Sequence, residues 1–136
     1  ILEFLDEVDL EIPMNPLPKR LVYDDPCHLI HAQGIAAAPR RLLAKIPQLE
    51  LASHRDAEAC CGAAGIYNLT HPEMSKRVLS PKIESILEAR PEMVSTANPG
   101  CAMQIASGLE ASGHAIEVLH PIELLELASR RAPDIA

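Results

Sequence analysis

The sequence predicts an α/β fold, an open and mainly parallel sheet of four strands with helices on both faces. Short apolar segments of strand length alternate with longer segments in which apolar residues recur at helical spacing. Turn-forming residues end the short segments, as Asn98-Pro99-Gly100 does after residues 93–97. Such alternation is typical of parallel sheets covered by helices. At 136 residues, the chain is long enough for one domain with its own core.

The start of the chain is predicted to lie outside the domain proper. Residues 1–8 carry apolar side chains on one helical face and indicate the end of a helix. Residues 11–19 contain three prolines, which is typical of a linker. We therefore divide the chain into a helix end and linker over 1–19 and a domain over 20–136.

The elements of the domain are predicted in chain order. Its first half is expected to contain a strand over 21–23, a helix over 39–45, a strand over 49–53 and a long loop over 54–71. Its second half is expected to contain a helix over 72–90, a strand over 93–97, a helix over 101–112, a strand over 116–119 and a last helix over 120–131. Pro81 falls inside the helix over 72–90 and is expected to kink it or split it in two.

Composition and charge exclude several classes of function. The formal net charge is −7 and aromatic residues make up 2% of the chain, so nucleic acid is not an expected partner. No segment approaches the roughly 18 apolar residues of a membrane span, and the acidic start is unlike a signal peptide. We expect a cytoplasmic protein that reaches the inner membrane, if at all, only through a complex. The missing initiator Met indicates a fragment of a longer chain.

The four cysteines follow three of the predicted strands. Cys27 comes after the first strand, Cys60 and Cys61 lie in the loop after the second, and Cys101 comes after the third, with intervals of 32 and 39 residues. Because the carboxyl ends of parallel strands meet at one edge of a sheet, where ligands bind, we expect the four thiols to converge. Adjacent cysteines without a secretion signal favour reduced, metal-binding thiols over disulfides.

Four thiolates can hold either an iron–sulfur cluster or a tetrahedral zinc ion. Structural zinc sites usually contain Cys-x-x-Cys, which this chain lacks. The long intervals and the adjacent Cys60 and Cys61 fit a larger object, since neighbouring side chains can reach two iron atoms of one cluster. An iron–sulfur cluster is therefore favoured, with zinc or a metal-free site as the alternatives.

Small residues and one histidine are expected to shape the cofactor pocket. Gly62 and Gly65 would let the backbone approach the inorganic core and donate N–H groups to its sulfurs. Gly100 is expected to supply an unusual backbone angle before the last cysteine. His28, next to the first cysteine, is the best histidine candidate for a hydrogen bond to a cluster sulfur.

The other titratable residues are not assigned to the site. His54, His71 and His114 are expected at the surface. Asp24 and Asp25 could act as acid or base, but a pair at the end of a strand is more typical of a turn cap. No serine-hydrolase order, phosphate-binding loop or catalytic carboxylate pair is present in the sequence.

Several motifs carry a resemblance to a known family: Asp25-Pro-Cys-His-Leu29, Cys60-Cys-Gly-Ala-Ala-Gly65, Asn98-Pro-Gly-Cys101 and His120-Pro121. In this order they resemble the cysteine-rich "CCG" domain family over about residues 20–130. That family occurs in the B-type subunit of heterodisulfide reductase, lactate-utilisation proteins, the C-type subunit of anaerobic glycerol-3-phosphate dehydrogenase and the glycolate oxidase iron–sulfur subunit. Residues 64–68 and 97–104 look most similar to the glycolate oxidase branch.

The resemblance implies an electron-transfer domain with Cys27, Cys60, Cys61 and Cys101 as cluster ligands. It would be the C-terminal CCG domain of the iron–sulfur subunit of a glycolate oxidase complex. The implied partners are flavin-containing subunits that oxidise glycolate to glyoxylate and a ferredoxin-like module in the same full-length chain. The isolated domain is not expected to be catalytic.

One departure from the family pattern bears on the cofactor. The fullest pattern ends in Cys-x-x-Cys, whereas Gln104 stands at that spacing after Cys101. The heterodisulfide reductase branch uses five cysteines for a noncubane cluster with disulfide chemistry, so four cysteines favour a simpler [4Fe–4S] cluster. Gln104 is expected to be a helix residue near the site. The alternatives are a lactate-oxidising or heterodisulfide-reductase-like complex, or a subunit-docking module with structural zinc.

Overall fold

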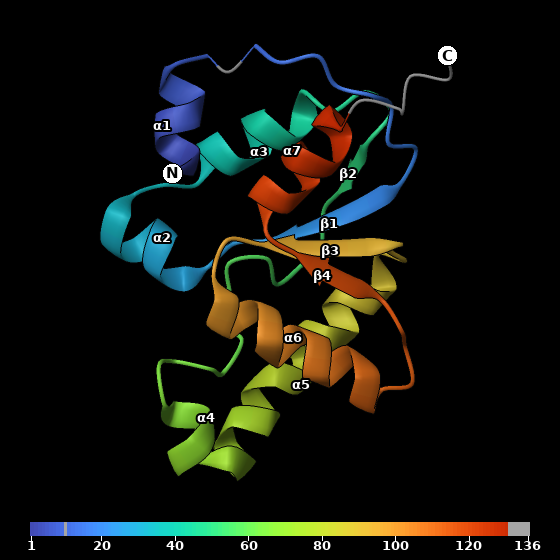
Figure 1. Cartoon of the computed structure of the whole chain (residues 1–136). Helices are drawn as coiled ribbons and strands as arrows, with labels where there is room; N and C mark the ends of the chain where they lie inside the picture. Colours follow the sequence, from blue (N-terminus) through green and yellow to red (C-terminus); the bar gives the residue numbers. More distant parts are fainter. Residues whose placement is uncertain (10, 131–136) are drawn as a thin grey trace.

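The computed structural model describes residues 1–9 and 11–130 and contains one open, parallel sheet of four strands (Figure 1). The strands are β1 (Arg20–Asp24), β2 (Glu50–Ala52), β3 (Met93–Thr96) and β4 (Glu117–Leu119), in the spatial order β2-β1-β3-β4. All three pairings are parallel. This order places a topological switch point between β1 and β3, and ligands bind outside the carboxyl ends of strands at such points.

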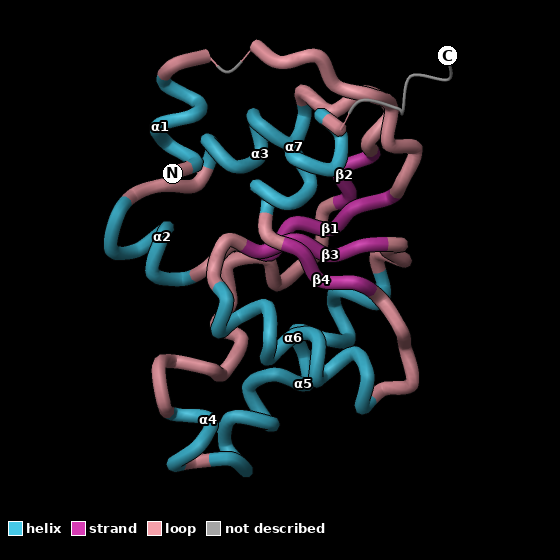
Figure 2. The backbone as a smooth tube through the Cα atoms, viewed as in Figure 1, coloured by secondary structure: helices cyan, strands magenta, loops and turns pink. Residues whose placement is uncertain are grey.

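Helices cover both faces of the sheet, as the sequence predicts (Figures 1 and 2). One face is covered by α1 (Leu2–Glu7), α3 (Ala37–Ala44) and α7 (Pro121–Ser129). The other face is covered by α5 (Pro72–Glu88) and α6 (Pro99–Ala111). Two short helices, α2 (Cys27–Gln33) and α4 (Tyr67–Thr70), complete the described elements.

Alternating side chains of the strands build two aliphatic cores. In β1, Leu21 and Tyr23 pack against α3 and α7, while Val22 packs against α5 and α6. In β3, Met93 and Val94 divide in the same way between the two cores. The alternation follows from the two-residue period of a strand, and it holds the sheet rigidly between two helix layers.

Three helices depart from the expected elements. α4 lies inside the loop predicted over 54–71, and none of its residues is buried. α2 was not predicted because none of its residues is buried, so it has no apolar stripe to detect. Its ends nevertheless carry local signals, since Pro26 precedes its first residue and Gly34 ends it in the left-handed conformation. α5 runs through Pro81 without a break, so the expected split is wrong. The buried face of α5 holds the helix together across the missing backbone hydrogen bond.

The first residues of the chain pack onto the domain. Leu2 is buried in the core beneath α3, and the Asp6 carboxylate pairs with Arg41. The division at residue 20, where β1 begins, stays a prediction. Among the described residues, no helix is both long and apolar enough to cross a membrane.

Candidate iron–sulfur site

The structure brings the four cysteines together at the carboxyl edge of the sheet. Cys27 is the first residue of α2, directly after β1, and Cys101 lies in the first turn of α6, after β3. Cys60 and Cys61 lie in the loop between β2 and α4. The Sγ atoms of Cys61 and Cys101 are 3.1 Å apart, and all four thiols are free. The site therefore lies at the switch point between β1 and β3.

The thiols influence one another electrostatically. Burial raises the pKa of Cys27, and the neighbouring Cys60 and Cys61 thiols raise it further. Hydrogen bonding to Cys101 lowers the pKa of Cys61 to about 6, against the effect of burial. The same hydrogen bond and burial raise the pKa of Cys101. The shifts have opposite signs because the two sulfurs are in direct contact, and thiolates rather than thiols bind metals.

Two serines of helix α5 form hydrogen bonds with the loop that carries Cys60 and Cys61, one on each side of this cysteine pair. Before the pair, Ser85 Oγ accepts a hydrogen bond from the Asp56 N–H at 3.0 Å. After the pair, Ser75 Oγ donates to the Gly62 carbonyl at 2.8 Å. Because α5 is anchored in the core, these bonds fix the loop relative to the sheet.

Gly62 occupies a position that only glycine fits. Its φ is +85°, and a Cβ there would lie 2.6 Å from the Ser75 carbonyl oxygen. Its N–H donates to the Cys60 Sγ at 3.3 Å, a bond of the kind that tunes metal-bound thiolates. Gly65 also has a positive φ, +69°, but its surroundings are open. The roles of both glycines at a cofactor stay predictions.

The prediction that Gly100 supplies an unusual backbone angle is wrong. Gly100 has an ordinary helical conformation within α6 and not an unusual backbone angle. Its small size is used instead, because a Cβ would lie 3.0 Å from Asn98 Oδ1. That oxygen caps α6 by accepting from the Cys101 N–H at 3.0 Å. Gly100 therefore leaves room for the cap that fixes Cys101.

His28 lies beside this cap. Its side chain is exposed, and its Nδ1 accepts from the Asn98 Nδ2 at 3.4 Å. His28 thus connects α2 to the start of α6, across the switch point. A hydrogen bond from His28 to a cluster sulfur stays a prediction.

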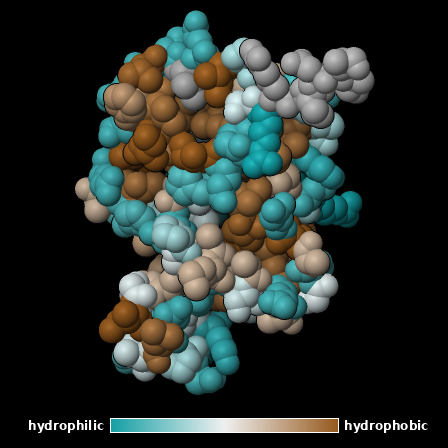
Figure 3. All heavy atoms as spheres, in the orientation of Figure 1, coloured by the Kyte–Doolittle hydropathy of each residue, from teal (hydrophilic) through white to brown (hydrophobic). Residues whose placement is uncertain are grey.

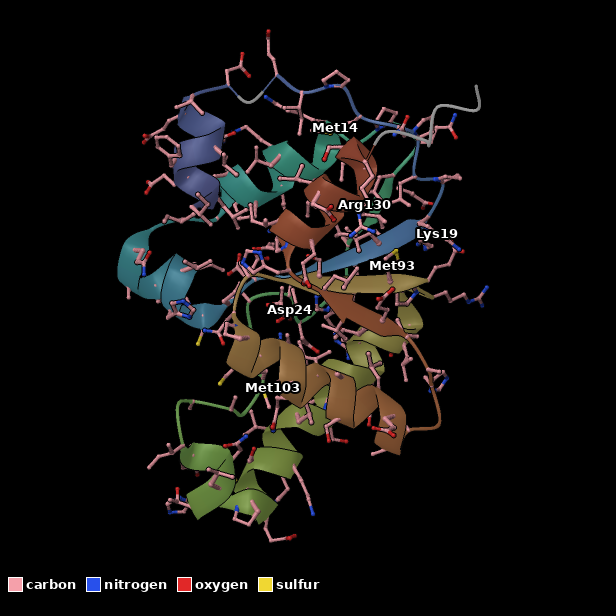
Figure 4. The ribbon with its side chains drawn as sticks, in the orientation of Figure 1. Met14, Lys19, Asp24, Met93, Met103 and Arg130 are labelled. Carbon is pink, nitrogen blue, oxygen red and sulfur yellow. The ribbon has the colours of Figure 1, made fainter. Side chains whose placement is uncertain are left out.

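The sequence analysis missed a buried polar group under the cysteine loop. His54 was expected at the surface but is buried, with Nδ1 3.2 Å from Ser85 Oγ and Nε2 3.7 Å from Asp24 Oδ1. Asp24, which Figure 4 labels, and Asp25 are buried as well. They pair with Lys82 and Arg40, respectively, instead of capping a turn. The available signal was Lys82 itself, because it falls on the apolar face of the helix predicted over 72–90.

Gln104 connects three elements near the site. On α6, its Nε2 donates to Ser75 Oγ at 2.8 Å, and its Oε1 accepts from Asn68 Nδ2 at 3.2 Å. Since Ser75 in turn holds the Gly62 carbonyl, Gln104 braces the cysteine loop. The expectation of a helix residue near the site agrees with this position.

Apolar side chains are exposed at α4 and at the start of α6. Ile66, Leu69 and Met103 are 69%, 78% and 76% exposed. Figure 3 shows apolar atoms gathered at the end of the molecule that α4 forms. These exposed apolar side chains therefore follow Cys61 and Cys101 within a few residues in the sequence.

The donor set is compared with the two candidate cofactors by its chemistry. Both a tetrahedral zinc ion and an iron–sulfur cluster accept four thiolates. Within residues 1–9 and 11–130, no three His, Cys, Asp or Glu side chains are already arranged to hold a metal ion. The residues present fit an iron–sulfur cluster by donor chemistry, since four soft thiols are free and the Gly62 N–H already donates to one of them, Cys60 Sγ.

Comparison with known proteins identifies the family. Residues 21–106 match the family described as "CCG: Cysteine-rich domain". The chain belongs to this family. The match includes every cysteine of the CCG domain, and it confirms the resemblance drawn from the motifs.

Curated relatives of this CCG domain are much longer proteins. The probable glycolate oxidase iron-sulfur subunit of Bacillus subtilis is 36% identical over 110 residues, covering 79% of this chain and 25% of the relative. A fumarate reductase (CoM/CoB) subunit of Methanothermobacter marburgensis is 36% identical over 130 residues, covering 94% and 26%. The lactate utilization protein A of an Exiguobacterium species is 31% identical over 115 residues, covering 85% and 47%. The chain thus spans between about a quarter and a half of these relatives.

Proposed function

We propose that this CCG domain is an electron-transfer domain of an oxidoreductase complex, with Cys27, Cys60, Cys61 and Cys101 as ligands of an iron–sulfur cluster. The observation that carries the proposal is the gathering of all four thiols at the switch point of the sheet. A bound cluster supplies reversible one-electron transfer. The relatives named as iron-sulfur subunits support this role.

The chain's own residues would hold and adjust the cofactor. The cap by Asn98 fixes the backbone of Cys101 at the start of α6 and so holds its sulfur at the site. The Gly62 N–H donates to Cys60 Sγ and stabilises negative charge on that sulfur. The low exposure of Cys61 and Cys101 excludes water from one side of the site, which strengthens these interactions.

At a finer level, we propose a [4Fe–4S] cluster and a glycolate-oxidising complex. Four cysteines match the ligand number of that cluster, and a glycolate oxidase relative supports the complex. Flavin-containing subunits would deliver the electrons, and a ferredoxin-like module in the same full-length chain would also take part in the electron transfer. The complex would be cytoplasmic. A lactate-oxidising complex is the second candidate, which the likeness to lactate utilization protein A favours.

The cofactor is tested on chain purified and loaded under argon. We expect a broad visible absorption that bleaches on reduction, with iron and acid-labile sulfide in equal amounts. Cys61→Ser should lose both, whereas Met103→Leu, an exposed change on α6, should keep them. A colourless chain that binds zinc in place of iron contradicts the proposal.

The substrate is tested on the whole complex. Addition of glycolate should bleach the absorption of the iron–sulfur subunit, and lactate should not. Bleaching by lactate alone would instead select the second candidate.

A further inference from the structure

A lysine of α5 is buried against the segments that lead to the cysteines. Lys82 of α5 is 1% exposed, and its Nζ donates to the Asp24 carboxylate and to the carbonyl oxygens of Asp56 and Ala57, the last two at 2.9 and 3.4 Å. These three bonds use the full donor capacity of an ammonium group. Lysine is almost never fully buried unless it is paired in this way. The ammonium is therefore a fixed charge and not a mobile surface group.

The partners of Lys82 lie on two of the segments that carry the cysteines. Asp24 ends β1, three residues before Cys27, while Asp56 and Ala57 lie shortly before Cys60 in the loop. The Asp25 N–H also donates to the Ala57 carbonyl at 3.0 Å, so the two segments are joined there directly. Lys82 thus links α5, the end of β1 and the cysteine loop at one point.

The charge of Lys82 acts on the site across a protein interior. The ammonium opposes the burial that raises the pKa of Asp24 to about 7. Burial and the same ammonium lower the pKa of His54 to about 4, so that imidazole is neutral. The neighbouring carboxylate of Asp25 forms an ion pair with Arg40. Lys82 therefore places a buried cation of α5 against two segments that lead to the cysteines, and Asp24 is the anion that offsets it once its carboxyl is ionised.

We propose that Lys82 is a positioning residue that also sets the reduction potential of the cysteine site, with Asp24 acting in the opposite direction. This inference rests on the proposed iron–sulfur function. Each electron that the loaded site accepts adds one negative charge to it. A buried ammonium stabilises that added charge and raises the potential, and a buried carboxylate lowers it, because little water screens either group.

The test compares midpoint potentials of the full chain, loaded under argon and titrated with redox mediators while its visible absorption is followed. Above about pH 8, where the Asp24 carboxyl is ionised, Lys82→Met should shift the potential down, and Asp24→Asn should shift it up. The double variant, which removes both charges, should lie between the two. Lys82→Arg should have a midpoint potential closer to that of the wild type than Lys82→Met has, because it keeps the cation. Lys76→Met is the control, since it removes a lysine from the exposed face of the same helix, where solvent screens the charge.

The outcomes separate this inference from the proposed function. A wild-type chain that binds no iron overturns the proposed function and this inference with it. Variants that bind iron with unshifted potentials, or with shifts of the same sign for Lys82→Met and Asp24→Asn, overturn only this inference. If Lys82→Met fails to fold, as circular dichroism would reveal, Asp24→Asn and the double variant still decide the sign.

Discussion

At the scale of single residues, His54 couples folding to pH. Burial, aided by the Lys82 charge, lowers its pKa from 6.5 to about 4 in the folded chain. The folded state therefore holds the neutral imidazole, and the stabilisation from this residue is fully present above about pH 6.5 and is lost as the pH falls through about 4. Its size is up to about 3 kcal/mol.

The contribution of His54 is best measured as the difference in unfolding free energy between the wild type and His54→Gln, because Asp24 makes stability depend on pH in the opposite direction. Burial raises the pKa of Asp24, so its contribution is present at low pH and is lost as the pH rises through about 7. In urea unfolding, the wild type should exceed His54→Gln in stability at about pH 8, and the difference should shrink by about pH 5. His114→Gln, at an exposed position, should show no such trend. A difference for His54→Gln that does not change with pH contradicts the assignment.

At the scale of elements, strands were easier to predict than short helices. β1 and β3 each contain a short buried apolar stretch, residues 21–23 and 93–94, and turn residues follow each strand, which marks them in the sequence. α2 buries none of its residues, and its existence depends on its end signals and on the site that it flanks. Pro81 shows the converse, since tertiary packing keeps α5 whole where local propensity predicts a break.

Gln104 gives a prediction at this scale, because it connects α6 to α5 and α4. Gln104→Ala removes both hydrogen bonds and leaves Ser75 Oγ without its donor, which should cost about 1–2 kcal/mol of unfolding free energy. Amide exchange should accelerate at Gly62 and Asn68, measured by hydrogen–deuterium exchange. Ser107→Ala, an exposed change on the same helix, should leave both amides protected. Unchanged exchange in Gln104→Ala would refute the bracing role.

At the scale of the whole molecule, the topology explains which part of the site was predictable. Cys27, Cys60, Cys61 and Cys101 could be placed together because parallel strands end at one edge, which needs only the order of elements. The pairing of Lys82 with Asp24 joins residues 58 positions apart on different elements, and no local pattern specifies it. The same holds for the bonds from Ser75 and Gln104, which depend on how α5 and α6 pack.

The four cysteines lie in the segments that follow β1, β2 and β3, so a cofactor bound to all four would tie three of the four strands together at their carboxyl ends. Such a group binds the folded chain and not the unfolded one, and it stabilises the fold by mass action. Loading under argon should therefore add about 3 kcal/mol or more, a rise of about 10 °C in the melting temperature by calorimetry. Cys60→Ser should show a much smaller rise, since one ligand is missing. Equal melting temperatures for the loaded and metal-free wild type would mean that these thiols do not share one cofactor.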